Sequence, residues 1–175
     1  MMVTSASRKE GRSTVACNLA VATAASGRNV LLVDGDSLNP SLHEVFALPN
    51  DRGFSDFLAM PAIGVGEAAM GAVWLTEISG LYVLPSGSAV AKLPALLGNG
   101  RAGALFDRLR PEFDLIVIDA APVLSTGEAR NLGRGADATV LVTRAGQTAP
   151  DLMDAAVQQL IENDVRLLGT IHNVS

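Results

Sequence analysis

Short apolar runs alternate with amphipathic stretches along the whole chain, and this alternation limits the folds that it can adopt. The runs are rich in β-branched residues and continuously apolar, as strands covered on both faces are. Such runs occupy residues 1–5, 30–33, 81–84, 115–118, 139–142 and 167–171. Helical patterns occupy residues 13–26, 102–110 and 151–162. Strands that alternate with helices predict one α/β domain over residues 1–175: a doubly wound, mostly parallel sheet with helices on both faces.

Composition narrows the class of protein further. Of the 175 residues, 49% are hydrophobic, which is enough for a sizeable core. No apolar run approaches the ~18–20 residues of a membrane-spanning helix, and the first residues lack the pattern of a signal peptide. The net charge of −5 argues against general nucleic-acid binding, which needs a basic face. Cys17 is the one cysteine, so no internal disulfide can form, and we expect a cytoplasmic protein.

A polar, basic segment follows the first predicted strand and opens the first predicted helix. It reads Ser5-Ala6-Ser7-Arg8-Lys9-Glu10-Gly11-Arg12-Ser13-Thr14. This is the context of a P-loop, in which backbone N–H groups and a helix N-terminus hold phosphate. Gly11 and Ser13 match the pattern G-x-x-x-x-G-K-[ST], whereas Ala6 and Arg12 replace its first glycine and its lysine. On this pattern alone, a basic strand-to-helix turn with Ser13 or Thr14 near the N-cap is the preferred explanation of the segment.

Acidic residues end two of the other predicted strands. Asp34 and Asp36 follow the run at residues 30–33, and Asp119 follows the run at residues 115–118. Ligands of such sheets bind at the carboxyl ends of the strands. Four apolar residues and then an aspartate also form a Walker B pattern, which places Asp119 to hold magnesium through water. The structural alternative is that Asp34 caps or bonds a neighbouring loop, as strand-end aspartates often do.

Together these segments resemble the bacterial tyrosine kinases that regulate exopolysaccharide export. The family pattern is S-A-x-P-G-E-G-K-S-T, L-L-I-D-A-D-x-R-x-P-x-L-H-x-x-F, G-L-S-D-x-L, L-x-V-L-P-x-G and D-x-P-P-V. The corresponding runs here are Ser5 to Thr14, Leu31 to Phe46, Gly53 to Leu58, Leu81 to Gly87 and Asp119 to Val123. Order and spacing agree from end to end. Min and Par partitioning ATPases share the phosphate-site motifs but lack the Pro-x-Leu-His and Leu-x-Val-Leu-Pro-x-Gly segments, so they are the second candidate.

The resemblance implies a set of binding and catalytic residues. ATP or ADP with Mg²⁺ is the implied ligand, and Asp36 would orient or deprotonate the attacking hydroxyl, with Arg12 as the phosphate-facing cation. The implied nucleotide contacts are Gly11, Arg12, Ser13, Thr14 and, at the adenine, Asn173. The implied magnesium site consists of Ser13, Asp34, Asp36 and Asp119.

The same resemblance implies a cellular role and partners. The implied partner is the cytoplasmic tail of an inner-membrane polysaccharide co-polymerase, which would recruit the chain to the inner face of the membrane. A homo-oligomer is also possible. The family's tyrosine-rich tail and its helical assembly segment fall outside residues 1–175, and Tyr82, in a predicted strand, is the one tyrosine of the sequence.

Departures from the family pattern predict weak or absent kinase activity. Arg12 stands at the lysine position, where a forked guanidinium is not equivalent to a compact ammonium group. Arg8 and Lys9 replace the family's Pro-Gly; if that glycine needs a positive φ, Lys9 obstructs it. Asn39 replaces an arginine, and Ala121-Pro122 replaces Pro-Pro. The sequence therefore predicts a regulatory binding module with a degenerate phosphate loop.

Overall fold

A computed structural model describes residues 1–60, 69–88, 93–97 and 100–174. Its strands are β1 (Met2–Ser5), β2 (Val30–Gly35), β3 (Trp74–Leu75), β4 (Leu81–Leu84), β5 (Leu115–Ala120), β6 (Thr139–Arg144) and β7 (Leu167–Asn173). Its helices are α1 (Arg12–Ala24), α2 (Leu42–Val45), α3 (Phe54–Ala59), α5 (Leu93–Leu97), α6 (Arg101–Leu109), α7 (Glu128–Arg134) and α8 (Pro150–Glu162).

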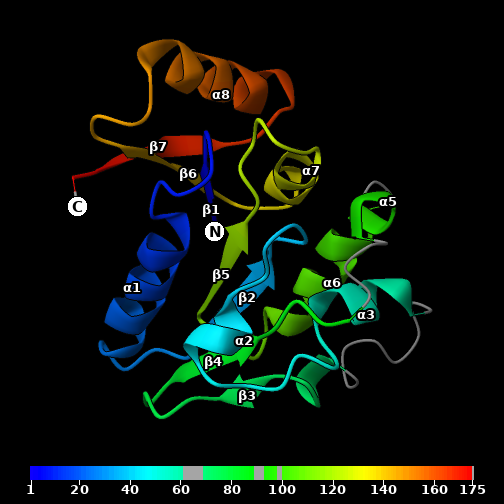
Figure 1. Cartoon of the computed structure of the whole chain (residues 1–175). Helices are drawn as coiled ribbons and strands as arrows, with labels where there is room; N and C mark the ends of the chain where they lie inside the picture. The colour runs from blue at the N-terminus through cyan, green and yellow to red at the C-terminus, as the bar shows by residue number, and fades with distance from the viewer. Residues whose placement is uncertain (61–68, 89–92, 98–99, 175) are drawn as a thin grey trace.

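The strands form one sheet in the order β3-β4-β2-β5-β1-β6-β7 (Figure 1). Each neighbouring pair is parallel except β3 and β4. The predicted α/β fold with a mostly parallel sheet is therefore confirmed, and the six predicted strands and three predicted helices agree with the structure to within two residues at each end.

Two apolar clusters cover the two faces of the sheet, because successive side chains of a strand point to opposite sides. On one face, Leu32 and Val83 pack against Ala16 and Ala20 of α1. On the other face, the strands pack against α3 and α5 to α8, and Figure 1 shows α3, α5, α6 and α7 on the side away from α1. Small alanine side chains bring α1 close to the sheet, and this closeness fixes the position of the loop that precedes the helix.

Several short elements were not evident in the sequence. Residues 85–101 are rich in glycine, proline, serine and alanine, yet they include the helix α5, and Leu97 is buried against the core. The reason is that Leu96 and Leu97 bury apolar area although the glycines and prolines of this segment suggest a loop. Residues 89–92 and 98–99 of that segment lie outside the described residues. Among the described helices, none is long and apolar enough to cross a bilayer.

Two of the sequence runs that carried the family resemblance contact each other. The backbone N–H groups of Phe54 and Ser55 donate to the carbonyl oxygens of Pro85 and Ser86, at 2.8 and 2.9 Å. A Cβ atom at Gly53 would collide with the Pro85 carbonyl, so only glycine permits this approach. The contact joins α3 to the end of β4 and gives both runs a structural role.

Candidate functional site

A cleft of about 390 Å³ lies at the carboxyl end of β1, where the first strand passes into α1. The sheet order places β1 between β5 and β6, so this edge receives the ends of several strands. The lining residues include the whole segment from Ser7 to Thr14, together with Asp36, Asn39 and Pro122. The cleft is therefore built from the three segments that the sequence singled out.

The strand register brings the acidic residues together. Asp34 of β2 and Asp119 of β5 are direct neighbours across the two parallel strands. Both are fully buried, and Asp36 is only 2% exposed. Three carboxylates in one buried place need counter-charges or hydrogen-bond donors, since an isolated buried charge is strongly destabilising.

Arg12 supplies that counter-charge. Its Nε donates to Asp119 Oδ1 at 2.5 Å, and its Nη2 donates to Asp36 Oδ2 at 2.7 Å. Nη2 also lies 3.4 Å from the Ser13 hydroxyl oxygen. Burial lowers the pKa of the guanidinium, but the two carboxylates more than reverse this effect, so the pKa of Arg12 is raised. Arg12 therefore forms a forked ion pair with Asp36 and Asp119 at the floor of the cleft.

Backbone donors satisfy the remaining oxygens of Asp36 and Asp34. Asp36 Oδ1 accepts the N–H groups of Leu38 and Asn39, at 2.9 and 3.0 Å. Asp34 Oδ2 accepts those of Ser41 and Leu42, both at 2.9 Å, at the start of α2. Burial raises the pKa of Asp34 to about 7, although these hydrogen bonds oppose the rise. Asp34 thus has the loop-bonding arrangement that was the structural alternative for it.

The carboxylate oxygens of this site have little capacity left to coordinate a magnesium ion. Mg²⁺ requires nearly octahedral oxygen coordination. Asp34 and Asp36 have both carboxylate oxygens in hydrogen bonds, and Asp119 Oδ1 binds Arg12. Asp119 Oδ2 is the one oxygen of the three carboxylates that is buried without a hydrogen-bond partner among the described residues. In this conformation the implied magnesium ligands Ser13, Asp36 and Asp119 surround a guanidinium instead.

The loop before Arg12 has the backbone of a phosphate-binding turn. Lys9 has a φ of 64° and Gly11 a φ of 84°, both in the left-handed region. Glycine adopts that region freely, whereas a lysine is strained there. The prediction for Lys9 depended on whether this position needs a positive φ. The position has a positive φ, and Lys9 adopts it with strain. The N–H groups of residues 12–14 open α1 and, as the first donors of a helix, have no acceptor within it.

Residues from distant strands hold this loop in place. Buried Glu10 accepts the N–H of Ser7 at 2.8 Å and the hydroxyl of Thr148. Arg144 donates to the Lys9 carbonyl at 3.0 Å. Sequence reasoning missed these contacts; an acidic residue inside a basic cluster was the one available signal for Glu10.

Asn173 belongs to the same support. Its side-chain amide donates to the Glu10 carbonyl at 3.2 Å, from the end of β7. A Cβ atom at Gly11 would collide with that amide. The suggested adenine contact of Asn173 stays a prediction, and in this structure the residue bonds the phosphate loop.

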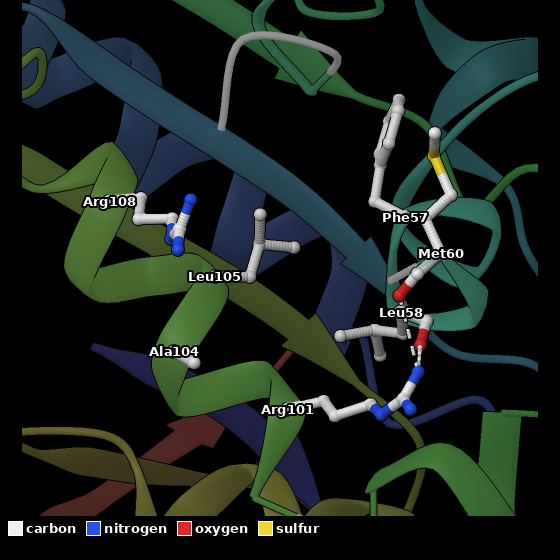
Figure 2. Close-up of a pocket in the computed structure, with 7 residues that line it drawn as sticks. All are labelled: Phe57, Leu58, Met60, Arg101, Ala104, Leu105 and Arg108. Carbon is white, nitrogen blue, oxygen red and sulfur yellow. Dashed lines mark hydrogen bonds between the residues drawn. The ribbon is translucent and has the colours of Figure 1, made fainter. Parts of the chain in front are cut away.

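A second, smaller pocket of about 100 Å³ lies between α3 and α6 (Figure 2). Its lining is Phe57, Leu58, Met60, Arg101, Ala104, Leu105 and Arg108. Arg101 donates to the carbonyl oxygens of Leu58 and Met60, at 2.9 and 3.2 Å, which joins the two helices. Among the described residues, the pocket's lining has no acidic residue or hydroxyl and shares no residue with the cleft at α1. The candidate site is therefore the cleft.

A parallel sheet with a phosphate-type loop between β1 and α1, and acids at the ends of β2 and β5, defines a P-loop NTPase-like domain. Comparison with known proteins shows to which family within this class the chain belongs. A family model described as "AAA domain" matches residues 7–166. The tyrosine-protein kinase YwqD of Bacillus subtilis (strain 168) is 34% identical over 173 residues, which cover 99% of this chain and 71% of that protein.

Solved structures agree with this result. The kinase domain of the Escherichia coli tyrosine kinase ETK superposes with a TM-score of 0.90 at 27% identity, over 98% of this chain and 66% of that one. A plasmid partition protein from Borrelia burgdorferi has the same fold, with a TM-score of 0.75 at 18% identity over 98% of this chain and 76% of that one. The chain belongs to the bacterial tyrosine-kinase family of P-loop domains.

Proposed function

We propose that this chain is a nucleotide-binding regulatory domain of exopolysaccharide synthesis and export that transfers phosphoryl groups weakly or not at all. Family membership supports a kinase-related role, since the relatives include several proteins described as tyrosine-protein kinases, one of them in a cps region. The carrying observation is that Arg12, at the position of the family's catalytic lysine, forms ion pairs with Asp36 and Asp119.

Phosphoryl transfer depends on positioning and on stabilisation of charge. A guanidinium held by two carboxylates cannot give its Nε and Nη2 donors to a terminal phosphate without leaving both buried acids unpaired. Asp36, the proposed base, is at the same time neutralised by Arg12 and by two backbone N–H groups. Loss of one such electrostatic contact typically costs ~10²–10³ in rate, and this site has both the cation and the base engaged.

The proposed nucleotide site is the turn itself. Exposed Arg8 and Lys9 bring positive charge to the mouth of the cleft, and the N–H groups of residues 11–14 would contact the phosphates of ATP or ADP. Calorimetric titration of the purified chain with ATP tests this. Binding that Ser13→Ala weakens supports the site, and binding that is indifferent to Ser13→Ala and to Asp119→Asn refutes it.

A restoration experiment tests the loss of catalysis. The triple change Arg12→Lys, Arg8→Pro and Lys9→Gly returns the loop to the family pattern. We expect ATP hydrolysis to rise above that of the unmodified chain. Hydrolysis by the unmodified chain at the rate of an active relative would contradict the proposal.

For the cellular role, we propose that the chain is recruited to the inner face of the membrane by the cytoplasmic tail of a polysaccharide co-polymerase, and that it acts there as a single subunit or as a homo-oligomer. Co-purification with such a protein, together with loss of polysaccharide on deletion, tests this. The alternative is a Min- or Par-type positioning ATPase that dimerises over ATP. The partition-protein fold favours it, and defective plasmid or septum positioning with normal polysaccharide would support it.

A further inference from the structure

The arrangement around Arg12 differs from a metal site in one respect: an organic cation occupies its centre. Oxygens of Asp36 and Asp119 both bond to the same guanidinium, through Nη2 and Nε, with the Ser13 hydroxyl beside Nη2. Two buried carboxylates and a P-loop hydroxyl would also be suitable ligands for a divalent cation. A guanidinium and a metal ion cannot be bound by the same oxygens at once.

The guanidinium also has donors left for a ligand. Arginine has five N–H donors in a planar fork. Those on Nε and Nη2 face Asp119, Asp36 and Ser13, whereas Nη1 donates to no group among the described residues. Arg12 lines the cleft, and its side chain is 10% exposed. A phosphate oxygen in the cleft can therefore be bonded by Nη1 while the two ion pairs stay intact.

We propose that Arg12 is a built-in replacement for the divalent cation, so that this site binds phosphate groups of a nucleotide without Mg²⁺. The nucleotide as ligand rests on the proposed function. The replacement of the metal by Arg12 does not depend on it. In a domain that had only lost its P-loop lysine, the residue at that position would have no binding role. Here Arg12 has one.

The first experiment measures the affinity for fluorescently labelled ADP, in EDTA and in millimolar Mg²⁺. We expect the two affinities of the unmodified chain to agree within about twofold. Arg12→Lys has a single ammonium group that cannot bond both acids in the same fork, so its affinity should rise about tenfold or more with Mg²⁺. Arg110→Lys, the same exchange in an exposed ion pair, is the matched control and should behave like the unmodified chain.

The second experiment measures bound Mn²⁺ by electron paramagnetic resonance, with inorganic phosphate present. We expect no bound Mn²⁺ in the unmodified chain or in Arg110→Lys, and bound Mn²⁺ in Arg12→Lys. Mn²⁺ bound by the unmodified chain and lost in Asp119→Asn would overturn the proposal. So would the absence of bound Mn²⁺ in folded Arg12→Lys, because the acids would then not form a latent metal site.

The two measurements separate the two proposals. If labelled ADP binds no form of the chain, nucleotide binding by the proposed function is wrong, and the Mn²⁺ result still decides the role of Arg12. If labelled ADP binds the unmodified chain about tenfold more weakly in EDTA, the replacement of the metal by Arg12 is wrong although the nucleotide site stands.

Discussion

Two arginines of this chain hold aspartates in forked ion pairs, in opposite surroundings. Arg12 joins Asp36 and Asp119, and its side chain is 10% exposed. Arg110 donates to both oxygens of Asp137, at 2.9 and 3.1 Å, and its side chain is 45% exposed. Water can replace either partner of the second pair but not of the first. The same chemistry is therefore dispensable at the surface and obligatory at the phosphate loop.

The largest expected effect is on stability. Arg12→Ala leaves two buried carboxylates without their cation, so we expect the free energy of unfolding to fall by ~3–5 kcal/mol. Arg110→Ala exposes its partner to water and should cost less than about 1 kcal/mol. Urea unfolding followed by circular dichroism measures both. If Arg12→Ala and Arg110→Ala lowered the free energy of unfolding by amounts equal to within about 1 kcal/mol, the buried and the exposed ion pair would not differ in their contribution to stability.

The pH dependence of stability should sharpen the comparison. Burial raises the pKa of Asp34, next to the buried pair, to about 7 from an ordinary value of 3.8. Between these two values the folded chain holds a proton that the unfolded chain has released, so the contribution of Asp34 to stability falls as pH rises through this window. Asp34→Asn should remove this slope, which amounts to a few kcal/mol at about 1.4 kcal/mol per unit of pKa.

Asp137 should show the opposite sign. Its hydrogen bonds with Arg110 lower its pKa, so its contribution is present above the ordinary value and is lost as pH falls through the lowered one. The measurement is chemical unfolding of Asp34→Asn and Asp137→Asn between about pH 3 and pH 8, a range that includes the ordinary carboxylate pKa and the raised pKa of Asp34. A difference between Asp34→Asn and the unmodified chain that does not change with pH would show that Asp34 titrates normally.

How far the sequence predicts this site depends on the distance between partners. The strand ends and their acids were predicted because continuous apolar runs mark strands, and parallel strands end at one edge. The pairing of Arg12 with Asp119 was not, since 107 residues separate them and neither local pattern indicates a contact between them. The helices α2, α3 and α7 are too short for a helical period to show. Thr148 and Arg144 carried no local signal for their contacts with the loop.

The smallest expected effect concerns the strained loop that carries Arg12. Lys9→Gly relieves a left-handed lysine at the cost of chain entropy, so we expect a gain of about 0.5–1 kcal/mol in unfolding free energy. Arg8→Gly is the matched control: Arg8 has no positive φ, and its replacement should bring no gain. A loss of stability in Lys9→Gly, measured by thermal unfolding, would show that the left-handed turn is not the source of strain.

The resonance of the Arg12 Nε–H group in a ¹H–¹⁵N spectrum reports most directly on the cation at the centre of the site. The bond to Asp119 should protect this proton from exchange with water, in contrast to the Nε–H of exposed Arg110. We expect a signal that disappears in Arg12→Lys, shifts in Asp119→Asn and stays unchanged on addition of millimolar Mg²⁺. A signal that Mg²⁺ shifts or abolishes would show that the metal displaces the guanidinium, and would contradict the replacement of the cation by Arg12.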